Sequence, residues 1–496
     1  MKTVVTRIAP SPTGSFAHIG NVRTLLYNYF LAKRHGGKFL VRLEDTDRDR
    51  YTPDFLDYFK DMCDWLGIIP DASYWNPDPA IGSFTQSERD YSSRVKFLLD
   101  NGLAYYAFDT KDDLDKAHKS IANFKYDANT RTTMRNSLTM SNEAVDNALS
   151  SGMTYVIRYA VPANLDITFT DAILGDITIN TNTVDDKVLL KSNGIGSYHL
   201  CNVCDDHDMG VSHVLRGQEW INSTPFHILL YKAFGWDIPT FAHLPLIMNP
   251  DGKGKLSKRT AHKYGIPIAP IGYTDDKGVY QNGWKDLGYD PQVFINALSL
   301  IGWNPGGDIE IMSIDELINN FSLDRVHKSG ARFDMDKAKW INSEYLKNTP
   351  NVDLIPFIKL KDNRYSGEKL NKIISLAKDR VSFKHELNNI VDLFYKDPII
   401  IDTKPFDDNY ISVMKSFIDN IDSINFNDVD SIKITISSIS DGLGIKMGKI
   451  MPGLRASLVG VPGPDLMTTM LILGKDQTKS RIINSLNATK KVKDLI

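Results

Sequence analysis

The sequence has little cysteine and no long apolar segment. It contains three cysteines among 496 residues, which excludes a disulfide framework and indicates a reducing compartment. No apolar run reaches the roughly 18 residues that a transmembrane helix needs, and the first apolar run is too short for a secretory signal. We therefore expect a cytoplasmic protein without a membrane partner.

Two of the cysteines form a CxxC pattern, at Cys201 and Cys204 in HLCNVCDD. A redox or zinc site needs further partners, and the only other cysteine is Cys63. His199 and His207 are nearby histidines that a zinc site could recruit, but the stretch is more typical of a packed helix. We therefore interpret both thiols as small core residues.

Neither sign of charge dominates the composition. The chain has 58 Lys and Arg against 61 Asp and Glu, a formal net charge of −3. This balance excludes a global attraction for nucleic acid but not a local basic face. The apolar fraction of 42% and the charged fraction of 24% are usual for a globular protein. The length predicts about three to five domains.

The first 45 residues follow a strand, turn, helix, strand pattern. Residues 3–9 are rich in β-branched side chains, residues 20–35 place apolar side chains at helical spacing, and residues 38–45 again resemble a strand. Such a βαβ unit predicts a parallel sheet with helices on its faces. Ligands of these sheets bind beyond the carboxyl ends of the strands, where the stretches 11–24 and 43–47 fall.

The pattern changes further along the chain. Residues 109–150 are charged and helical in pattern, whereas residues 154–190 alternate as strands do. This change predicts an inserted α+β domain. Helix and strand patterns return over residues 194–240, and amphipathic helical segments dominate beyond about residue 330.

The turn SPTGSFAHIGNVRT, at residues 11–24, is rich in conformationally special residues. Pro12 and the preceding Pro10 fix an extended approach, and we expect Gly14 to permit an unusual backbone turn. The free N–H groups of the helix that follows favour an anion. Gly20 allows close approach of a ligand, and His18 can donate to a phosphate oxygen. A phosphate site and a tight structural turn both fit this stretch.

A second stretch, GKGKLSKR at residues 252–259, is basic and favours the interpretation of the first as a phosphate site. It places Ser257 between Lys255 and Lys258 but lacks the spacing of a P-loop. A solvated basic turn is the alternative. Together with the first turn, mobile lysines can stabilise the charge that builds on a reacting triphosphate.

The two stretches belong to a longer series of motifs. The series contains HIGN at 18–21 and KLSKR at 255–259, which are similar to the HIGH and KMSKS signatures, and TRIAPSPTG at 6–14, RLEDTDR at 42–48, QSERDYS at 86–92, VLLKSNG at 188–194, YHLCNVCDDHDMGVSHVLRGQEW at 198–220, STPFHILLYKAFGW at 223–236 and GKIMPGLRASLVG at 448–460. In this order the motifs resemble the bacterial type of glutamyl-tRNA synthetase, a class I aminoacyl-tRNA synthetase.

The resemblance implies a multidomain α/β chain. Its catalytic domain would be a class I Rossmann-like parallel sheet with an inserted α+β domain, followed by an all-α anticodon-binding region. The expected domains are the first half of the catalytic domain at 1–108, the acceptor-stem-binding insertion at 109–190, the second half of the catalytic domain at 191–245, a stem-contact domain with the KLSKR loop at 246–335 and the helical anticodon-binding region at 336–496.

The resemblance also implies roles for individual residues. A glutamate pocket reads two carboxylates and one ammonium group, and guanidinium groups suit the carboxylates. The implied glutamate-binding residues are Arg7, Ser11, Glu44, Tyr198, Asn202 and Arg216, with Glu44 on the ammonium group. The implied ATP-binding residues are His18, Gly20, Asn21, Lys255, Ser257 and Lys258, of which His18, Gly20, Lys255 and Lys258 serve catalysis. Glu219 and Arg455 are the candidate tRNA contacts.

The implied reaction has two steps. Glutamate attacks the α-phosphorus of ATP, which is accompanied by Mg²⁺, and forms glutamyl-adenylate and pyrophosphate. The 2′-hydroxyl of the terminal adenosine of tRNA-Glu then takes the glutamyl group and releases AMP. Members of this family commonly need tRNA before they activate glutamate. Charging of tRNA-Gln is left open, and we expect a monomer.

The sequence departs from the family pattern at three places. Some members carry a zinc-binding cysteine cluster where residues 101–113 lie here, but this segment contains no cysteine, so we expect no structural zinc. Asn21 replaces the second histidine of HIGH, which glutamate enzymes tolerate. Three residues, Ser15, Phe16 and Ala17, separate Gly14 from the motif histidine where we expect two.

Other functions remain as alternatives. A glutaminyl-tRNA synthetase favours a PPEPNG-like opening and a β-barrel anticodon region, whereas this chain has APSPTG and a helical last third. A shortened tRNA-modifying paralogue would lack the anticodon region. A catalytically silent tRNA-binding paralogue is disfavoured by the intact His18, Lys255 and Lys258. A small-molecule nucleotidyltransferase does not account for the long helical C-terminal region.

Overall fold

The computed structural model describes residues 3–400, 402–460 and 463–493, with only the backbone of residues 490–493. The chain divides after Met335 into two compact units, Met1–Met335 and Asp336–Ile496. We call them unit 1 and unit 2.

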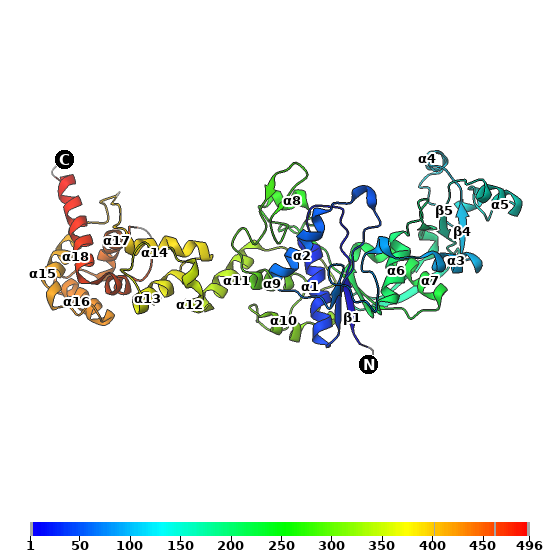
Figure 1. Ribbon diagram of the computed structural model, residues 1–496. Helices are drawn as coiled ribbons and strands as arrows, with labels where there is room; N and C mark the ends of the chain where they lie inside the picture. The colour runs from blue at the N-terminus through cyan, green and yellow to red at the C-terminus, as the bar shows by residue number, and fades with distance from the viewer. Residues whose placement is uncertain (1–2, 401, 461–462, 494–496) are drawn as a thin grey trace. The chain divides into compact units, whose positions relative to one another are not determined.

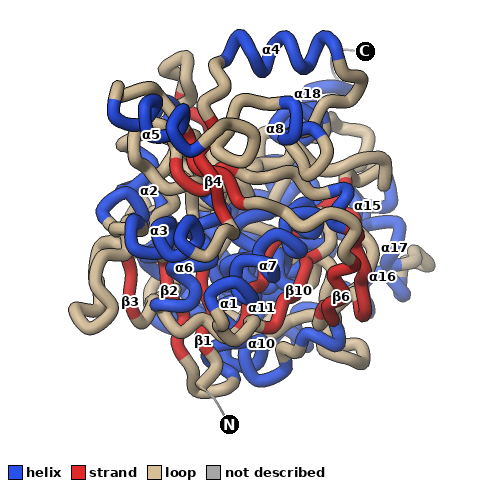
Figure 2. Tube along the Cα trace, turned by 90° about the vertical axis from the view of Figure 1, so that its right-hand side faces the viewer, coloured by secondary structure: helices blue, strands red, loops and turns tan. Residues whose placement is uncertain are grey.

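Mostly parallel strands, with one antiparallel strand at an edge, form the centre of unit 1 (Figures 1 and 2). The strands are β1 (Val5–Ile8), β2 (Lys38–Val41), β3 (Ala72–Ser73), β6 (Asp166–Asp171), β7 (Gly175–Asn180), β9 (His213–Gly217) and β10 (Thr240–Leu244). One sheet has the order β1-β2-β3 and the other β7-β6-β10-β9. The Ser212 N–H donates to the Val5 carbonyl at 3.0 Å and joins β1 to the start of β9. The strands therefore follow the order β3-β2-β1-β9-β10, which is that of a doubly wound sheet.

Helices cover this sheet. They are α1 (Ile19–Arg34), α2 (Asp54–Leu66), α3 (Ser92–Asp100), α6 (Tyr198–Asp208) and α7 (Thr224–Phe234). Leu25, Leu26 and Phe30 of α1 are fully buried, as the helical spacing predicted. The predicted βαβ unit is confirmed, with strands a few residues shorter than expected.

An antiparallel sheet lies at one end of unit 1 (Figure 1), with a small core that includes Tyr105 and Phe124, while its Ile157 and Leu189 belong to the main core. It consists of β4 (Ala104–Ala107), β5 (Val156–Tyr159) and β8 (Val188–Leu190), accompanied by α4 (Lys111–Ser120) and α5 (Asn142–Ser150). The predicted strand pattern over residues 154–190 is confirmed. The β6–β7 hairpin within that range, however, joins the main sheet, because Asp171 pairs in parallel with Phe241 of β10.

The remainder of unit 1 carries the KLSKR motif. It contains β11 (Ile247–Met248), α8 (Lys258–Lys263), β12 (Tyr273–Thr274), β13 (Tyr280–Gln281), α9 (Pro291–Ser299), α10 (Ile314–Asn320) and β14 (Ala331–Arg332). Strands β11 and β14 pair in parallel, and β12 and β13 form a short hairpin. Residues 252–257 of the motif lie in a loop that ends at α8.

Unit 2 is helical throughout its described residues, as predicted. Its helices are α11 (Met335–Asn348), α12 (Asn351–Leu354), α13 (Gly367–Lys378), α14 (Leu387–Tyr395), α15 (Asp408–Asp419), α16 (Val429–Gly442), α17 (Met447–Leu458) and α18 (Leu466–Lys493), the last interrupted at Gly474. Arg481 of α18 is buried and donates from Nη1 to the Leu393 carbonyl at 2.8 Å and also to the Leu458 carbonyl. One guanidinium therefore ties α14, α17 and α18 together.

All three cysteines are buried. Cys63 lies in α2, and Cys201 and Cys204 lie in α6. Burial raises the pKa of each thiol. The prediction that the CxxC thiols are core residues in a packed helix is confirmed. Among the described helices, none has the length and apolar character to cross a membrane.

Candidate active site

One pocket of unit 1 collects the residues predicted to bind ATP and glutamate. Its volume is about 630 Å³, and it lies beyond the carboxyl ends of β1 and β9, where a ligand of such a sheet is expected. The predicted residues that line it are Arg7, Ser11, His18, Gly20, Asn21, Glu44, Tyr198, Asn202, Arg216, Glu219, Lys255, Ser257 and Lys258. Every residue predicted for the two small substrates is therefore in one place.

His18 is the N-cap residue of α1. Its Nδ1 accepts a hydrogen bond from the Gly20 N–H at 3.0 Å, so the neutral ring carries its proton on Nε2. Nε2 is buried without a hydrogen-bond partner. An N–H donor without a protein acceptor is costly to bury, so this donor suits an oxygen atom of a ligand in the pocket.

We expect His18 to remain neutral down to about pH 5. Burial and then the charge of Lys255 lower the pKa of His18 to about 4, so protonation requires a pH well below that of a free imidazole. Nitrogen-15 NMR of histidine-labelled protein, with the His18 signals identified by their loss in His18→Asn, should report the Nε2–H tautomer from pH 8 to pH 5.5. A His18 signal that titrates between pH 6 and 7 would contradict this.

The turn before α1 differs from the prediction in its glycine. Gly14 does not have a positive φ, and a Cβ there would meet nothing within 4 Å. The prediction that Gly14 permits an unusual turn is therefore wrong. The segment is instead held by its carbonyl groups, since Pro10 accepts from the Glu44 N–H at 2.9 Å and Pro12 from the Thr52 N–H at 2.7 Å.

The longer turn places Phe16 beside the KLSKR motif. The ring of Phe16 stacks on that of Tyr273, with centroids 4.1 Å apart. Lys258 Nζ lies 5.6 Å from the Phe16 centroid and 5.8 Å from the Tyr273 centroid. An ammonium group near two aromatic faces is attracted by both, so the aromatic pair holds Lys258 at the edge of the pocket.

Lys255 and Ser257 have partners of their own. Lys255 Nζ lies 3.3 Å from Glu219 Oε1, and both side chains are about half exposed, at 53% and 47%. An exposed ion pair of this kind contributes little, so Lys255 can exchange Glu219 for a phosphate at small cost. Ser257 caps α8, where its Oγ accepts from the Thr260 N–H at 3.3 Å.

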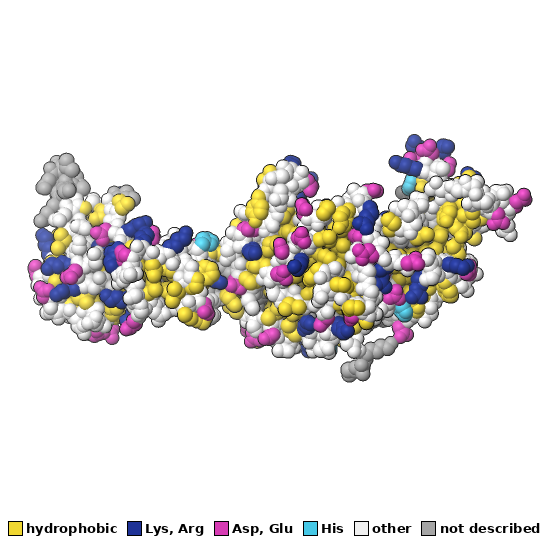
Figure 3. Space-filling model, viewed as in Figure 1, with side chains coloured by type: hydrophobic (Ala, Val, Ile, Leu, Met, Phe, Trp, Pro, Cys, Tyr) yellow, Lys and Arg dark blue, Asp and Glu magenta, His cyan; other side chains and the backbone are white. Residues whose placement is uncertain are grey.

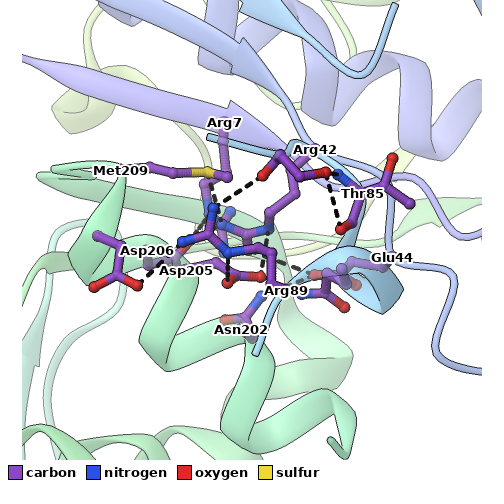
Figure 4. Close-up of polar contacts among 12 residues, drawn as sticks. Arg7, Arg42, Glu44, Thr85, Arg89, Asn202, Asp205, Asp206 and Met209 are labelled. Atoms are coloured by element: carbon purple, nitrogen blue, oxygen red, sulfur yellow. Dashed lines mark hydrogen bonds and ion pairs between the residues drawn. The ribbon is translucent and has the colours of Figure 1, made fainter. Parts of the chain in front are cut away.

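A buried cluster of ion pairs adjoins the pocket (Figure 4). Asp206 Oδ1 accepts from Arg7 Nε at 3.0 Å and from Arg42 Nη1 at 2.8 Å. Asp205 lies 2.8 Å from Arg89 Nε and 3.6 Å from Arg42 Nε. With Glu44 the cluster contains three carboxylates and three guanidinium groups, so its charges balance.

Glu44 is a member of this cluster that also lines the pocket, as Arg7 does. Its Oε1 accepts from Asn202 Nδ2 at 2.9 Å and lies 3.6 Å from Arg42 Nη2. Burial raises the pKa of Glu44, and the charge of Arg42 and the hydrogen bond from Asn202 oppose this rise. A ligand ammonium group would favour the charged carboxylate further.

Sequence reasoning did not identify Arg42, Asp205 or Asp206 as part of the site. Helix α6 carries Tyr198, Asn202 and Asp206 at four-residue spacing, so one face of it presents polar groups to the pocket and the cluster. Adjacent acidic residues in a packed helix were the available signal, because buried carboxylates need partners.

Arg216 extends from β9 into the pocket. It is 6% exposed, and its donors reach His243, His227 and Thr224. Tyr198 lies nearby, with its ring 4.6 Å from that of Trp220. Burial raises the pKa of Tyr198 to about 12, which keeps its hydroxyl protonated.

Arg455 lies apart from this pocket, in α17 of unit 2. Its Nη1 donates to the carbonyl groups of Gly463 at 2.9 Å and Pro464 at 3.2 Å. Its role in tRNA binding stays a prediction. In the part of the chain that the structure describes, no three His, Cys, Asp or Glu side chains gather as a metal site would require.

Comparison with known proteins agrees with this geometry. Residues 3–340 match the family model of the class I tRNA synthetases (E and Q), catalytic domain, and residues 350–486 match an anticodon binding domain. The chain is 42% identical to the glutamate–tRNA ligase of Bacteroides thetaiotaomicron, over 99% of each chain, and 40% identical to that of Amoebophilus asiaticus, over 98% of each.

A solved structure is similar over the same length. A glutamate tRNA ligase from Elizabethkingia meningosepticum, crystallised with its amino acid, superposes with a TM-score of 0.90 at 40% identity, over 98% of this chain and 99% of the other. Both the sequence and the fold are thus shared from end to end. The chain belongs to the glutamyl-tRNA synthetase family of class I aminoacyl-tRNA synthetases.

Proposed function

We propose that this protein activates L-glutamate with ATP and transfers it to the terminal adenosine of tRNA-Glu. The charge state of Arg216 carries the proposal. Arg216 is buried, yet its hydrogen-bond acceptors are the imidazoles of His243 and His227, the hydroxyl of Thr224 and the carbonyl of Trp220, none of which is acidic. A buried cation without a carboxylate partner favours an anionic ligand group.

Three charged groups of the pocket match the three of glutamate. Arg216 and Arg7 are complementary to the two carboxylates, and Glu44 to the ammonium group. Arg7 is already neutralised by Asp206, so the uncompensated charge belongs to Arg216. We propose that Arg216 meets the side-chain carboxylate. Glutamine has a neutral amide there and would leave this charge unpaired, which disfavours it.

In the first step the glutamate carboxylate attacks the α-phosphorus, and pyrophosphate leaves. We propose that His18 donates from Nε2 to a phosphate oxygen, and that Lys255 and Lys258 approach the same group as its charge increases. Mg²⁺, held by the ATP phosphates as is usual for nucleotides, neutralises part of that charge when bound. Positioning and charge stabilisation suffice, and no covalent enzyme intermediate is needed.

In the second step the 2′-hydroxyl of the terminal adenosine attacks the acyl carbon of the adenylate, and AMP leaves. We propose that Glu219 lies near this adenosine. It is half exposed at the rim, and its carboxylate folds against Gly217, where a Cβ would come within 2.2 Å of Oε2. Gly217 therefore leaves the space that this carboxylate occupies.

ATP–pyrophosphate exchange tests the proposal. We expect exchange with glutamate in the presence of tRNA-Glu and charging of that tRNA. Exchange and charging are measured for purified tRNA-Glu and for purified tRNA-Gln, each with glutamate and with glutamine as the amino acid. Exchange and charging with glutamine alone would overturn the proposal, whereas glutamate on tRNA-Gln would identify a non-discriminating enzyme.

A further inference from the structure

Arg216 is connected through His243 to the β6–β7 hairpin. Arg216 and His243 are register partners on the parallel strands β9 and β10, and Arg216 Nε donates to His243 Nε2 at 3.1 Å. His243 Nδ1 lies 2.6 Å from Oδ2 of Asp171, the last residue of β6. All three side chains are buried, so the contacts exclude water.

The hydrogen bonds fix the protonation of His243. Asp171 Oδ1 accepts from the N–H groups of Ile173 and Leu174, each at 3.0 Å, which anchors the carboxylate. Oδ2 therefore accepts a hydrogen bond from His243 Nδ1–H. Nε2 is left with its lone pair, which is what a guanidinium donor requires.

A second imidazole holds the other side of Arg216. Its Nη1 lies 3.2 Å from His227 Nδ1, and His227 Nε2 lies 3.1 Å from His199 Nδ1. Because Arg216 can only donate, His227 Nδ1 accepts and Nε2–H donates onward to His199. Thr224 Oγ1 accepts from Nη2 at 2.8 Å. The guanidinium is thus fixed in position by acceptors that leave its charge intact.

We propose that Asp171 is a positioning residue for amino-acid selection, which acts by holding His243 in the tautomer that aims Arg216 at a carboxylate of the substrate. This inference rests on the proposed binding of glutamate by Arg216. Asp171 lies outside the pocket lining and acts only through His243. The hairpin that carries it thereby contributes to substrate choice.

The isosteric change Asp171→Asn tests this role, and it also replaces by an amide nitrogen the Oδ2 that accepts from the His243 backbone N–H at 3.1 Å. That backbone change is the same in the His243→Gln background, which therefore controls for it. The amide oxygen must still accept from the Ile173 and Leu174 N–H groups, so the amide NH₂ faces His243 Nδ1. His243 then carries its proton on Nε2, where it meets the Arg216 Nε–H. Two facing donors displace the guanidinium, with little change in the shape of the core.

We expect Asp171→Asn to raise the KM for glutamate about 10- to 100-fold in ATP–pyrophosphate exchange with tRNA present. The KM for ATP should change less than about threefold. Asp176→Asn is the matched control, because Asp176 is exposed on the same hairpin and loses the same charge. It should leave both constants unchanged.

His243→Gln tests whether the effect passes through the tautomer. A glutamine amide oxygen can reach the position of Nε2 and accept from Arg216 without help from Asp171. Asp171→Asn should therefore raise the KM for glutamate less than about threefold in the His243→Gln background. An equal rise in both backgrounds would contradict the proposal.

Two further outcomes are decisive. If the wild-type protein shows no glutamate-dependent exchange, the proposed function fails. If the wild-type protein shows this exchange, but Asp171→Asn raises the KM values for glutamate and ATP equally or changes neither of them, this inference fails. Should Asp171→Asn not fold, nitrogen-15 NMR of His243 in the wild-type protein decides. A neutral ring with its proton on Nδ1 is the expected result, and a proton on Nε2 would contradict the proposal.

Discussion

Replacing His18 by asparagine should lower the rate of glutamate-dependent ATP–pyrophosphate exchange by about 10²- to 10³-fold and leave the thermal stability of the protein almost unchanged. Asparagine is among the best N-cap residues, and its Oδ1 lies where Nδ1 accepts from the Gly20 N–H. It does not reach the position of Nε2, the buried donor without a partner. The loss should appear in exchange kinetics, with melting temperature measured in parallel.

His18→Gln is the complementary variant. Its amide NH₂ can reach the position of Nε2, but its side chain does not cap α1. We expect a smaller loss of exchange than for His18→Asn, and a loss of stability of about 1 kcal/mol from the missing cap. If His18→Asn kept its activity and His18→Gln lost it, the cap, rather than the Nε2 donor, would be what the reaction needs.

Replacing Lys258 by alanine should lower the rate of adenylate formation by about 10²- to 10³-fold while the Kd for tRNA-Glu changes less than about threefold. Lys258 is exposed and rests against the Phe16 and Tyr273 rings, which hold its ammonium group weakly. Its charge can therefore move to the phosphates as pyrophosphate forms. A single-turnover assay of adenylate formation measures the rate, and a filter-binding assay measures the Kd for tRNA-Glu.

Lys263→Ala provides the control for charge. Lys263 is exposed in the same helix, α8, and lies outside the pocket lining, so its removal should change neither quantity. If Lys258→Ala weakened tRNA binding as much as it slowed adenylate formation, Lys258 would be a tRNA contact and its role at the transition state would be rejected.

The sequence predicts the parts of the fold that depend on local patterns. The apolar spacing around Leu25 and Phe30 identified α1, and the alternation over residues 154–190 identified the strands there. Local patterns did not predict which strands pair with one another. Whether the β6–β7 hairpin joins the insertion or the main sheet depends on which strand edge is open, and local spacing carries no information about that edge.

The site residues that lie in sequence motifs were predicted, whereas those that reach the site through contacts distant in the chain were missed. His18, Lys255 and Arg216 lie in recognisable motifs and line one pocket. Asp171 and His243 are 72 residues apart in the chain, and only the register of β6, β10 and β9 brings them to Arg216. Gly14 illustrates the opposite error, since a glycine in a loop suggests a special φ that neighbouring backbone hydrogen bonds made unnecessary.

The burial of all three cysteines has a practical consequence for experiments in solution. With each thiol at most 1% exposed and held as the thiol by its raised pKa, none presents a nucleophile to a maleimide under native conditions. Lys119→Cys in unit 1 and Lys433→Cys in unit 2 replace exposed residues and would then be the sites that react. A donor and an acceptor dye attached to these two positions would report, by single-molecule energy transfer, any change in the distance between them during a charging cycle.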